Sequence, residues 1–330
     1  MREILNHLYN HKTLQREEAE DVLTRMARGE FNNSQIASFI SVYLMRSIKV
    51  EELSGFRDAL LNLCIPVDLS DFNTIDMCGT GGDGKNTFNI STIASFIVAG
   101  AGRHVAKHGN YGVSSTCGSS NVMEHFGYRF TNDPEILKKQ LNKAGICFLH
   151  APIFNPAMKN VAPVRRELGV KTFFNMLGPM VNPSFPGNQV VGVYSLELAR
   201  MYNYLYQKTG KNFIILHDLG GYDEISLTHP FKMISNQKDA TLDVSVFSEK
   251  PLAPSALEGG NSIQEAADIF MKILEGKGTP EQNKVAAANA AMGLKCYHPD
   301  QSLEDCMAEA SEAVASGKAL KSFKTLIDTQ

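Results

Sequence analysis

The chain has 330 residues, of which 43% are hydrophobic and 20% charged, and its formal net charge is -3. This length predicts one large domain with a smaller one, and the composition is ordinary for a soluble globular protein. The charge gives no reason to expect a nucleic-acid surface. No apolar run approaches the length needed to span a bilayer, and the first residues do not have the pattern of a secretory signal.

Residues 1 to about 65 predict helices, because their apolar residues recur at helical spacing. The predicted buried faces are Ala19, Val22, Leu23 and Met26, then Ile36, Ile40, Tyr43 and Leu44, then Leu53, Phe56 and Leu60. Gly29 is expected to end the first of these helices, and Asn33 or Ser34 to cap the second. Such a short helical segment has little core of its own. We therefore expect it to pack on a later segment or on a second copy of itself.

From Asn73 onward, short apolar runs alternate with helical patterns. This alternation predicts a mostly parallel sheet flanked by helices, with ligands bound beyond the carboxyl ends of the strands. The predicted strands are 74–78, 103–107, 146–150, 189–194 and 213–216. The predicted helices are 90–101, 121–126, 134–143 and 196–207, with further helical patterns from residue 261 onward.

Residues 155–186 interrupt this alternation with a helical pattern over 157–168 and a proline-rich exit. We expect this segment to rejoin the N-terminal helices and make the small domain discontinuous. The small helical domain would then comprise residues 1–68 with about 157–183, and the larger α/β domain residues 69–156 with about 184–330. Two crossings of the chain between domains predict a hinge.

Three Gly/Ser-rich turns occur within about fifty residues, at 79–84, 107–110 and 114–120. Each follows an apolar run and precedes a helical pattern, so we expect all three at one edge of the sheet. Backbone N–H groups at glycine turns and helix starts bind phosphate. A simple helix cap at Asn89, Ser91 or Thr92 would explain one such turn but not three.

The first turn resembles two nucleotide-binding motifs without matching either. Gly79, Gly81 and Gly84 satisfy the dinucleotide pattern, but the expected acidic residue about 20 positions later is missing. The same turn resembles a phosphate-binding loop until Asn86 stands where Ser or Thr should hold magnesium. We therefore favour neither motif.

Adjacent carboxylates at Asp223 and Glu224 follow the last predicted strand. They are either a solvated turn or the ligands that magnesium takes together with phosphate. Arg165 and Arg166 are either two surface residues or include one that binds a carboxylate bidentately. Lys107 either neutralises phosphate or only ends a strand.

The six cysteines contain no Cys-x-x-Cys pair, which is typical of reduced thiols in a cytoplasmic protein. Cys78 and Cys117 flank glycine turns, and we interpret them as packing residues rather than nucleophiles. The sequence thus predicts a cytoplasmic location.

The ordered set of motifs resembles the anthranilate phosphoribosyltransferase family over essentially the whole chain. The matching segments are 79–83, 89–92, 107–110, 114–119, 155–158, 164–169, 175–179 and 223–224. The resemblance implies a fold like that of the nucleoside phosphorylases, with a small helical domain hinged to a larger α/β domain. It also implies a homodimer formed through the helices, and it leaves open an association with anthranilate synthase.

The resemblance implies a magnesium-dependent pentosyltransferase of tryptophan biosynthesis. Such an enzyme moves the phosphoribosyl group of phosphoribosyl pyrophosphate to the amine of anthranilate, releasing pyrophosphate. The implied phosphoribosyl pyrophosphate site is Gly79, Gly82, Asp83, Thr87, Asn89, Ser91, Thr92, Lys107, Ser115 and Ser119. The implied ligands of magnesium, with two ions expected, are Ser91, Asp223 and Glu224. Anthranilate would meet Gly79, Asn110 and Arg165, with His108 lining its channel.

The chain departs from the family pattern at three places. Asn155 stands where His is common, Asn121 where Asp is common, and Tyr111-Gly112 where Arg-Ala is usual. No general base is expected, because an aromatic amine is already largely neutral at pH 7. Two alternatives remain at this stage, namely a pyrimidine nucleoside phosphorylase and a non-catalytic protein that binds phosphoribosyl pyrophosphate.

Overall fold

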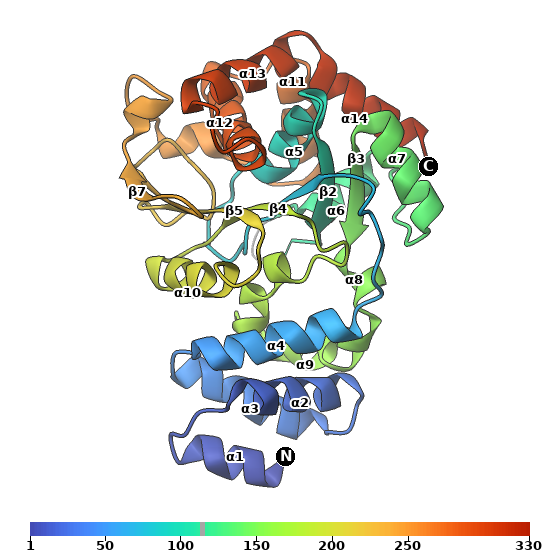
Figure 1. Ribbon diagram of the computed structural model, residues 1–330, viewed down its shortest axis with the longest axis vertical. Helices are drawn as coiled ribbons and strands as arrows, with labels where there is room; N and C mark the ends of the chain where they lie inside the picture. Colours follow the sequence, from blue (N-terminus) through green and yellow to red (C-terminus); the bar gives the residue numbers. More distant parts are fainter. Residues whose placement is uncertain (113–115) are drawn as a thin grey trace. The chain divides into compact units, whose positions relative to one another are not determined.

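The computed structural model describes residues 1–112 and 116–330. The chain forms two compact units, one of Met1–Pro66 with Pro152–Pro183 and one of Val67–Ala151 with Ser184–Gln330. We call them the helical unit and the α/β unit (Figure 1). Within the described ranges, no helix is both long and apolar enough to cross a membrane.

The helical unit combines four N-terminal helices with a later return of the chain. The helices are α1 (Arg2–Tyr9), α2 (Arg16–Ala27), α3 (Asn33–Met45) and α4 (Val50–Leu63). The return contains α8 (Ala151–Phe154), η1 (Pro156–Asn160), α9 (Ala162–Leu168), η2 (Phe173–Met176) and η3 (Gly178–Met180). Its Asn160 Nδ2 donates to the Ala27 carbonyl at 2.7 Å, and its Phe173 ring stacks on Phe56 at 4.5 Å.

A close approach of α2 and α4 builds the centre of this unit. Gly55 allows it, because a Cβ atom there would lie 2.1 Å from the Arg16 carbonyl oxygen. Phe39 and Tyr43 then pack edge to face against both Phe56 and Phe173. Aromatic pairs in this geometry stabilise a core by more than their buried area alone.

Two details of α3 differ from the sequence prediction. Leu44 is 44% exposed, and Phe39 is fully buried in its place. The inward face therefore contains positions 36, 39, 40 and 43, and Leu44 lies about 100° further around the helix. The cap is Asn32, whose Oδ1 accepts from the Gln35 N–H at 3.0 Å, because the helix already begins at Asn33.

The α/β unit is organised around a seven-stranded sheet in the order β3-β2-β1-β4-β5-β6-β7. The strands are β1 (Thr74–Met77), β2 (His104–Gly109), β3 (Ile146–His150), β4 (Asn188–Gly192), β5 (Asn212–Asp218), β6 (Phe231–Ser235) and β7 (Asp239–Leu242). Neighbours from β3 to β5 pair in parallel, whereas β6 and β7 are antiparallel. The mostly parallel sheet is confirmed, but the sequence analysis missed β6 and β7.

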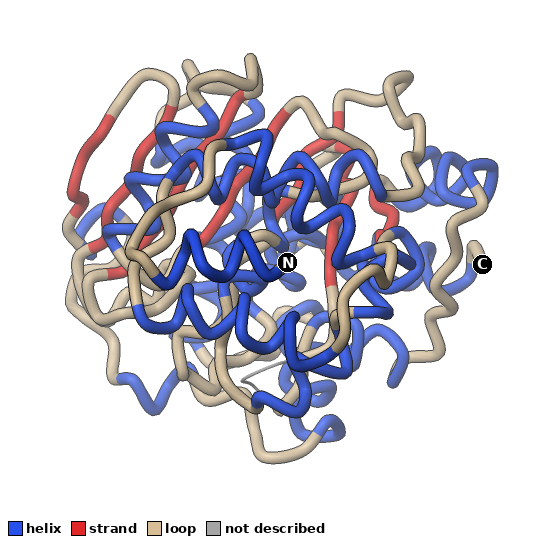
Figure 2. The backbone as a smooth tube through the Cα atoms, turned by 90° about the horizontal axis from the view of Figure 1, so that it is seen from below, coloured by secondary structure: helices blue, strands red, loops and turns tan. Residues whose placement is uncertain are grey.

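Helices cover the sheet on both faces, as Figure 2 shows with strands in red and helices in blue. The helices of this unit are α5 (Ile90–Gly100), α6 (Ser119–His125), α7 (Pro134–Ala144), α10 (Leu196–Tyr206), α11 (Ile263–Leu274), α12 (Pro280–Tyr297), α13 (Leu303–Ala315) and α14 (Lys318–Asp328), with short η4 (Val244–Val246) and η5 (Pro254–Leu257). Successive residues of β5 point to opposite faces. Ile214 therefore joins the core that contains α5 and α12, while Phe213 packs on Tyr206 of α10 at 5.6 Å.

Two predicted segments have different structures. The single helix expected over 157–168 is divided into η1 and α9, with Pro163 in the first turn of α9. Proline has no N–H to continue a preceding helix, and it favours the first turn of a new one. Residues 107–109 belong to β2 rather than to a turn. Gly109 serves close packing there, since a Cβ atom would lie 2.6 Å from the Phe148 ring.

A buried ion pair stabilises the helical unit. Glu52 is fully buried and accepts from Arg46 at 2.6 and 2.8 Å, and from the backbone N–H groups of Lys49 at 2.9 Å and Leu14 at 3.1 Å. Burial alone would raise the pKa of Glu52, but these hydrogen bonds outweigh it and hold the pKa below its usual 4.5. The pair therefore stabilises the fold only while Glu52 is charged.

We expect Glu52→Gln to lower the free energy of unfolding by about 3 kcal/mol, because it leaves Arg46 without its carboxylate. The effect should be full above pH 4.5 and should shrink as the pH falls through the lowered pKa of Glu52. Urea unfolding of both proteins across this pH range measures it. Glu51→Gln, at an exposed position of the same helix, is the control. An equal loss in the control would contradict the assignment.

Candidate functional site

The first glycine turn extends from the carboxyl end of β1. The Cys78 N–H donates to the Val190 carbonyl at 3.2 Å and the Thr80 N–H to the Gly192 carbonyl at 2.9 Å, so the turn begins alongside β4. Gly81 and Gly82 then adopt φ angles of 61° and 77°. Side chains rarely allow these angles, so this path of the backbone requires glycine.

The acidic pair after β5 contacts this turn directly. The Gly81 N–H donates to Asp223 Oδ2 at 2.6 Å, and the Ser91 N–H donates to Glu224 Oε1 at 2.8 Å. A Cβ atom on Gly79 would lie 2.3 Å from Asp223 Oδ2, so only glycine leaves room for the carboxylate. The structure thus brings the first turn, the start of α5 and the acidic pair together.

Burial and neighbouring carboxylates disfavour negative charge on the acidic pair. Burial raises the pKa of Asp223 well above its usual value, and the charges of Glu224 and Asp83 raise it further. Burial also raises the pKa of Glu224 to about 7, although the Ser91 N–H and Lys107 act in the opposite direction. Like charges in a poorly solvated site favour binding of a positive ion.

Oxygen ligands of this kind fit magnesium. One oxygen of each carboxylate accepts a backbone N–H, which orients the group. Among the described residues, no group of three His, Cys, Asp or Glu side chains is arranged to hold a metal. Two carboxylates that act together with oxygens of a bound ligand are the usual donor set for magnesium with phosphates.

Three further residues of the predicted phosphoribosyl pyrophosphate site, Asp83, Thr87 and Asn89, lie in or shortly after the first turn. Asp83 Oδ1 accepts from the Lys85 N–H at 3.0 Å, which orders the turn. Thr87 forms a bridge with Glu258. Asn89 precedes α5 without capping it, and instead its Nδ2 donates to the Cys117 carbonyl at 3.0 Å. Its buried Oδ1 has no hydrogen-bond partner within the described ranges. Asn89 thus connects the first and third turns.

Lys107, His108 and Thr92 are buried beneath the turns. Lys107 is 2% exposed, and its Nζ donates to the Met77 carbonyl at 2.6 Å at the end of β1. The His108 N–H donates to Asp76 Oδ1 at 3.0 Å. Thr92 is 1% exposed in the first turn of α5. The positive charge of Lys107 therefore lies at the carboxyl end of β1, in the interior and not on the surface.

Hydrogen bonds join described residues on either side of the third turn. The Asn110 carbonyl accepts from the Ser120 N–H at 3.1 Å and from Ser119 Oγ at 3.3 Å. Asn121 Oδ1 accepts from the N–H groups of both Gly112 and Gly118 at 3.0 Å. Asn121, which departs from the family pattern, therefore has a structural role: its side chain holds the backbone at Gly112 and Gly118 together. Ser115 lies outside the described residues.

The helical unit contains the remaining predicted side chains. Arg165 in α9 is partly buried, with its guanidinium 4.9 Å from the centre of the Phe174 ring, whereas Arg166 is exposed. Burial lowers the pKa of Arg165. Asn155 is 9% exposed and precedes η1. Of the two arginines, Arg165 is thus the one in a packed environment.

The sequence analysis missed the structural role of Asn86. It used this residue only as evidence against a phosphate-binding loop. Its Nδ2 donates to the Gly260 carbonyl at 2.8 Å, and its carbonyl accepts from the Gly259 N–H at 2.8 Å. A residue more than 170 positions away therefore supports the first turn. The adjacent glycines at 259 and 260 were the available signal.

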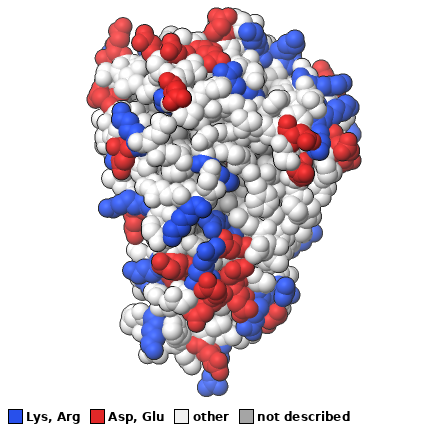
Figure 3. Space-filling view, viewed as in Figure 1, with Lys and Arg blue, Asp and Glu red and all other residues white. Residues whose placement is uncertain are grey.

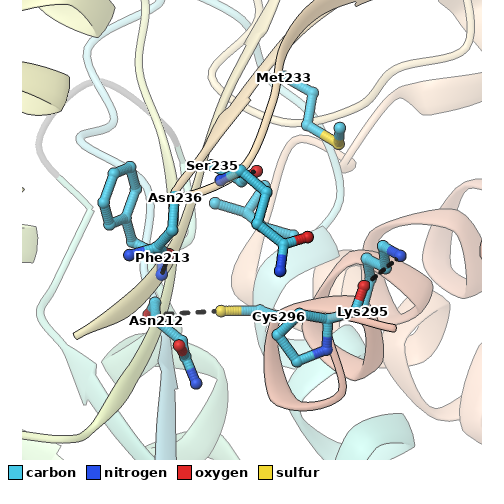
Figure 4. A pocket seen from close by; sticks show the side chains of 10 residues that line it. Asn212, Phe213, Met233, Ser235, Asn236, Lys295 and Cys296 are labelled. Atoms are coloured by element: carbon cyan, nitrogen blue, oxygen red, sulfur yellow. Dashed lines mark hydrogen bonds between the residues drawn. The ribbon is translucent and has the colours of Figure 1, made fainter. Parts of the chain in front are cut away.

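A separate small cavity of about 60 Å³ lies at the amino end of β5 (Figure 4). Its Lys295 Nζ donates to the carbonyls of Pro299 and Gln301, both at 2.6 Å. Cys296 Sγ approaches the Asn212 carbonyl at 3.5 Å, and burial raises the pKa of this thiol to about 12. Since the amine and the thiol already have partners, we assign no ligand to this cavity.

On the face in Figure 3, basic and acidic side chains are intermixed.

Comparisons with known proteins found matching family models and similar relatives. Residues 71–320 match the family described as "Glycosyl transferase family, a/b domain", and residues 2–64 match "Glycosyl transferase family, helical bundle domain". The chain is 59% identical over 329 residues to an anthranilate phosphoribosyltransferase from Flavobacterium psychrophilum, covering 99% of this chain and 98% of the relative. A relative of the same name from Flavobacterium johnsoniae is 58% identical over 330 residues, covering 99% and 98%.

Solved structures are similar over the same length. The anthranilate phosphoribosyltransferase of Thermus thermophilus matches with a TM-score of 0.90 and 30% identity, covering 98% of both chains. The Saccharomyces cerevisiae enzyme in complex with PRPP and Mg matches with a TM-score of 0.90 and 26% identity, covering 98% of this chain and 96% of that one. These matches confirm a helical bundle domain combined with a larger α/β domain.

Proposed function

The chain belongs to the anthranilate phosphoribosyltransferase family, and from this premise we propose that the first glycine turn and the acidic pair hold its diphosphate and magnesium. The enzyme transfers the phosphoribosyl group of phosphoribosyl pyrophosphate to the amine of anthranilate in tryptophan biosynthesis. The products are N-(5-phosphoribosyl)anthranilate and pyrophosphate. The contact between Asp223 and the Gly81 N–H carries the proposal, because it joins a predicted metal ligand to a predicted phosphate site. The comparisons favour neither the phosphorylase nor the non-catalytic protein.

We assign the phosphoribosyl pyrophosphate to the three turns at the edge of the sheet. Main-chain N–H groups of the first turn and of the start of α5 would donate to its phosphate oxygens. The side chains proposed to join them are Asp83, Thr87, Asn89, Ser91, Thr92, Lys107, Ser115 and Ser119, beside Gly79 and Gly82. The buried Asn89 Oδ1, which has no hydrogen-bond partner among the described residues, supports a ligand here, since buried polar atoms normally have partners.

Asp223 and Glu224, with Ser91, are the proposed ligands of magnesium, and we propose two ions. The ion supplies positive charge to the pyrophosphate that leaves the ribose. The protein would hold that charge in place through carboxylates already oriented by backbone N–H groups. The raised pKa values of both carboxyls support this assignment, because a cation would relieve their repulsion.

We propose that Arg165 binds the carboxylate of anthranilate, with Gly79, Asn110 and His108 as further contacts. A guanidinium pairs with a carboxylate through two parallel hydrogen bonds. Its partial burial against Phe174 supports the role, because a desolvated charge binds its partner more strongly. Attack by the neutral aromatic amine needs no general base, so positioning is the main task of these residues.

We further propose a homodimer formed through the helical unit. Tyr9, Leu44 and Met45 are 55%, 44% and 87% exposed, and exposed apolar residues of this size favour an interface.

A cytoplasmic location is supported by six free cysteines, all in the described part of the chain. Association with anthranilate synthase stays a prediction from the family resemblance.

The activity is tested with the full-length protein, anthranilate, phosphoribosyl pyrophosphate and magnesium. We expect anthranilate fluorescence to disappear with time, and to do so more than about 100-fold more slowly in Asp223→Asn, because that variant loses a charged metal ligand. Asp300→Asn, at an exposed site, is the matched control. Unchanged fluorescence at every magnesium concentration would rule out the transfer, whereas full activity of Asp223→Asn would rule out its role.

Arg165→Gln should lower kcat/KM for anthranilate by about 2–4 kcal/mol of transition-state stabilisation, because a charged hydrogen-bond pair is lost. The KM for phosphoribosyl pyrophosphate should remain near its original value. Arg166→Gln, next to it but exposed, should leave both parameters almost unchanged. Equal losses in the two variants, measured by steady-state kinetics, would contradict the assignment.

Met45→Glu tests the dimer, because it puts a charge on the exposed apolar end of α3. Sedimentation should give the mass of two chains for the unmodified protein and a shift toward one chain for the variant. Glu51→Gln, on α4, should leave the mass unchanged. A single-chain mass for the unmodified protein would refute the proposal.

A further inference from the structure

Helix α12 packs on β4, β5 and α5 through small apolar residues (Figure 1). Around its middle, the alanines at 286–288 and 290–291 are at most 4% exposed. Asn289 interrupts this run and is itself only 5% exposed. Asparagine is unfavourable inside a helix and costly in a core, so a buried one requires specific partners.

Asn289 finds these partners on the acidic turn, 64 positions earlier in the chain. Its Oδ1 accepts from the Ile225 N–H at 3.0 Å, and its Nδ2 donates to the Ile225 carbonyl at 2.9 Å. Nδ2 also donates to the Val285 carbonyl at 2.9 Å within α12. A single amide group thus binds both backbone groups of the residue that directly follows Glu224.

The acidic turn is constrained on its other sides as well. Asp218 is fully buried and accepts from the N–H groups of Gly220 at 2.7 Å and Ser226 at 3.2 Å, which closes the turn at its base. A Cβ atom on Gly192 would lie 1.4 Å from the Asp223 carbonyl oxygen. The turn is therefore pressed against the end of β4, and Asn289 fixes it from α12.

We propose that Asn289 is a positioning residue that holds Asp223 and Glu224 in the arrangement that binds magnesium with the diphosphate. This inference rests on the proposed function and adds a residue that touches neither ion nor substrate. Losing the amide would leave the Ile225 backbone without two buried hydrogen bonds. The turn would then move, and the two carboxylates would no longer converge on one ion.

Partners that orient metal ligands typically affect metal affinity by about 10- to 100-fold when they are removed. We therefore expect Asn289→Ala and Asn289→Asp to require at least about 10-fold more magnesium for half-maximal binding of phosphoribosyl pyrophosphate. High magnesium should restore binding. The KM for anthranilate at saturating magnesium should change less than about twofold, because the amide holds the metal turn rather than the acceptor side.

Calorimetric titration of phosphoribosyl pyrophosphate into the full-length protein, without anthranilate, at a series of magnesium concentrations measures this requirement directly. Asn283→Ala is the matched control, because Asn283 lies on the same helix and its Nδ2 donates to the nearby Gly278 carbonyl at 3.1 Å. Glu52→Gln is a second control for loss of stability alone. Neither control should shift the magnesium requirement.

A magnesium requirement equal to that of the unmodified protein in both variants would overturn the inference. So would a loss of binding that magnesium does not restore, or circular dichroism showing that neither variant folds. If Asn289→Ala alone fails to fold, the magnesium requirement of Asn289→Asp tests the inference, because this variant retains the acceptor for the Ile225 N–H. Failure of the unmodified protein to bind phosphoribosyl pyrophosphate with magnesium would instead refute the proposed function.

Discussion

Two poorly solvated carboxylates held against backbone N–H groups are the constraint on which the site depends. Asp223 and Glu224 accept N–H groups from Gly81 and Ser91, and these bonds give each carboxylate a fixed direction. The arrangement tolerates no side chain at Gly79 or Gly192, because a Cβ atom there would collide with Asp223. This arrangement places like charges close together, and the proposed magnesium would offset their repulsion.

The parallel sheet makes this contact geometrically available. β1, β4 and β5 are neighbours, so the turns that leave their carboxyl ends meet at one edge. The buried face of α12 then fixes the acidic turn from the side through Asn289. The same helix thus packs on the sheet and hydrogen-bonds the acidic turn.

The helical unit contributes differently. Its core is held by close helix packing at Gly55, by an aromatic cluster around Phe173 and by the buried Glu52 with Arg46. The returning segment provides Arg165, whose guanidinium packs on Phe174 within the same unit. Packing on Phe174 limits the side-chain freedom that Arg165 would lose on pairing with the proposed carboxylate.

The sequence by itself determined the fold class, the five parallel strands and the residues of the first turn, because hydrophobic period and glycine placement are local signals. It did not reveal β6 or the edge strand β7, or that 107–109 continue β2. It also left open whether the acidic pair was solvated and which of Arg165 and Arg166 was packed. Tertiary structure alone decided these points and the bond from Asn289 to Ile225, because burial and contacts across 64 positions depend on how distant segments pack, which no local pattern encodes.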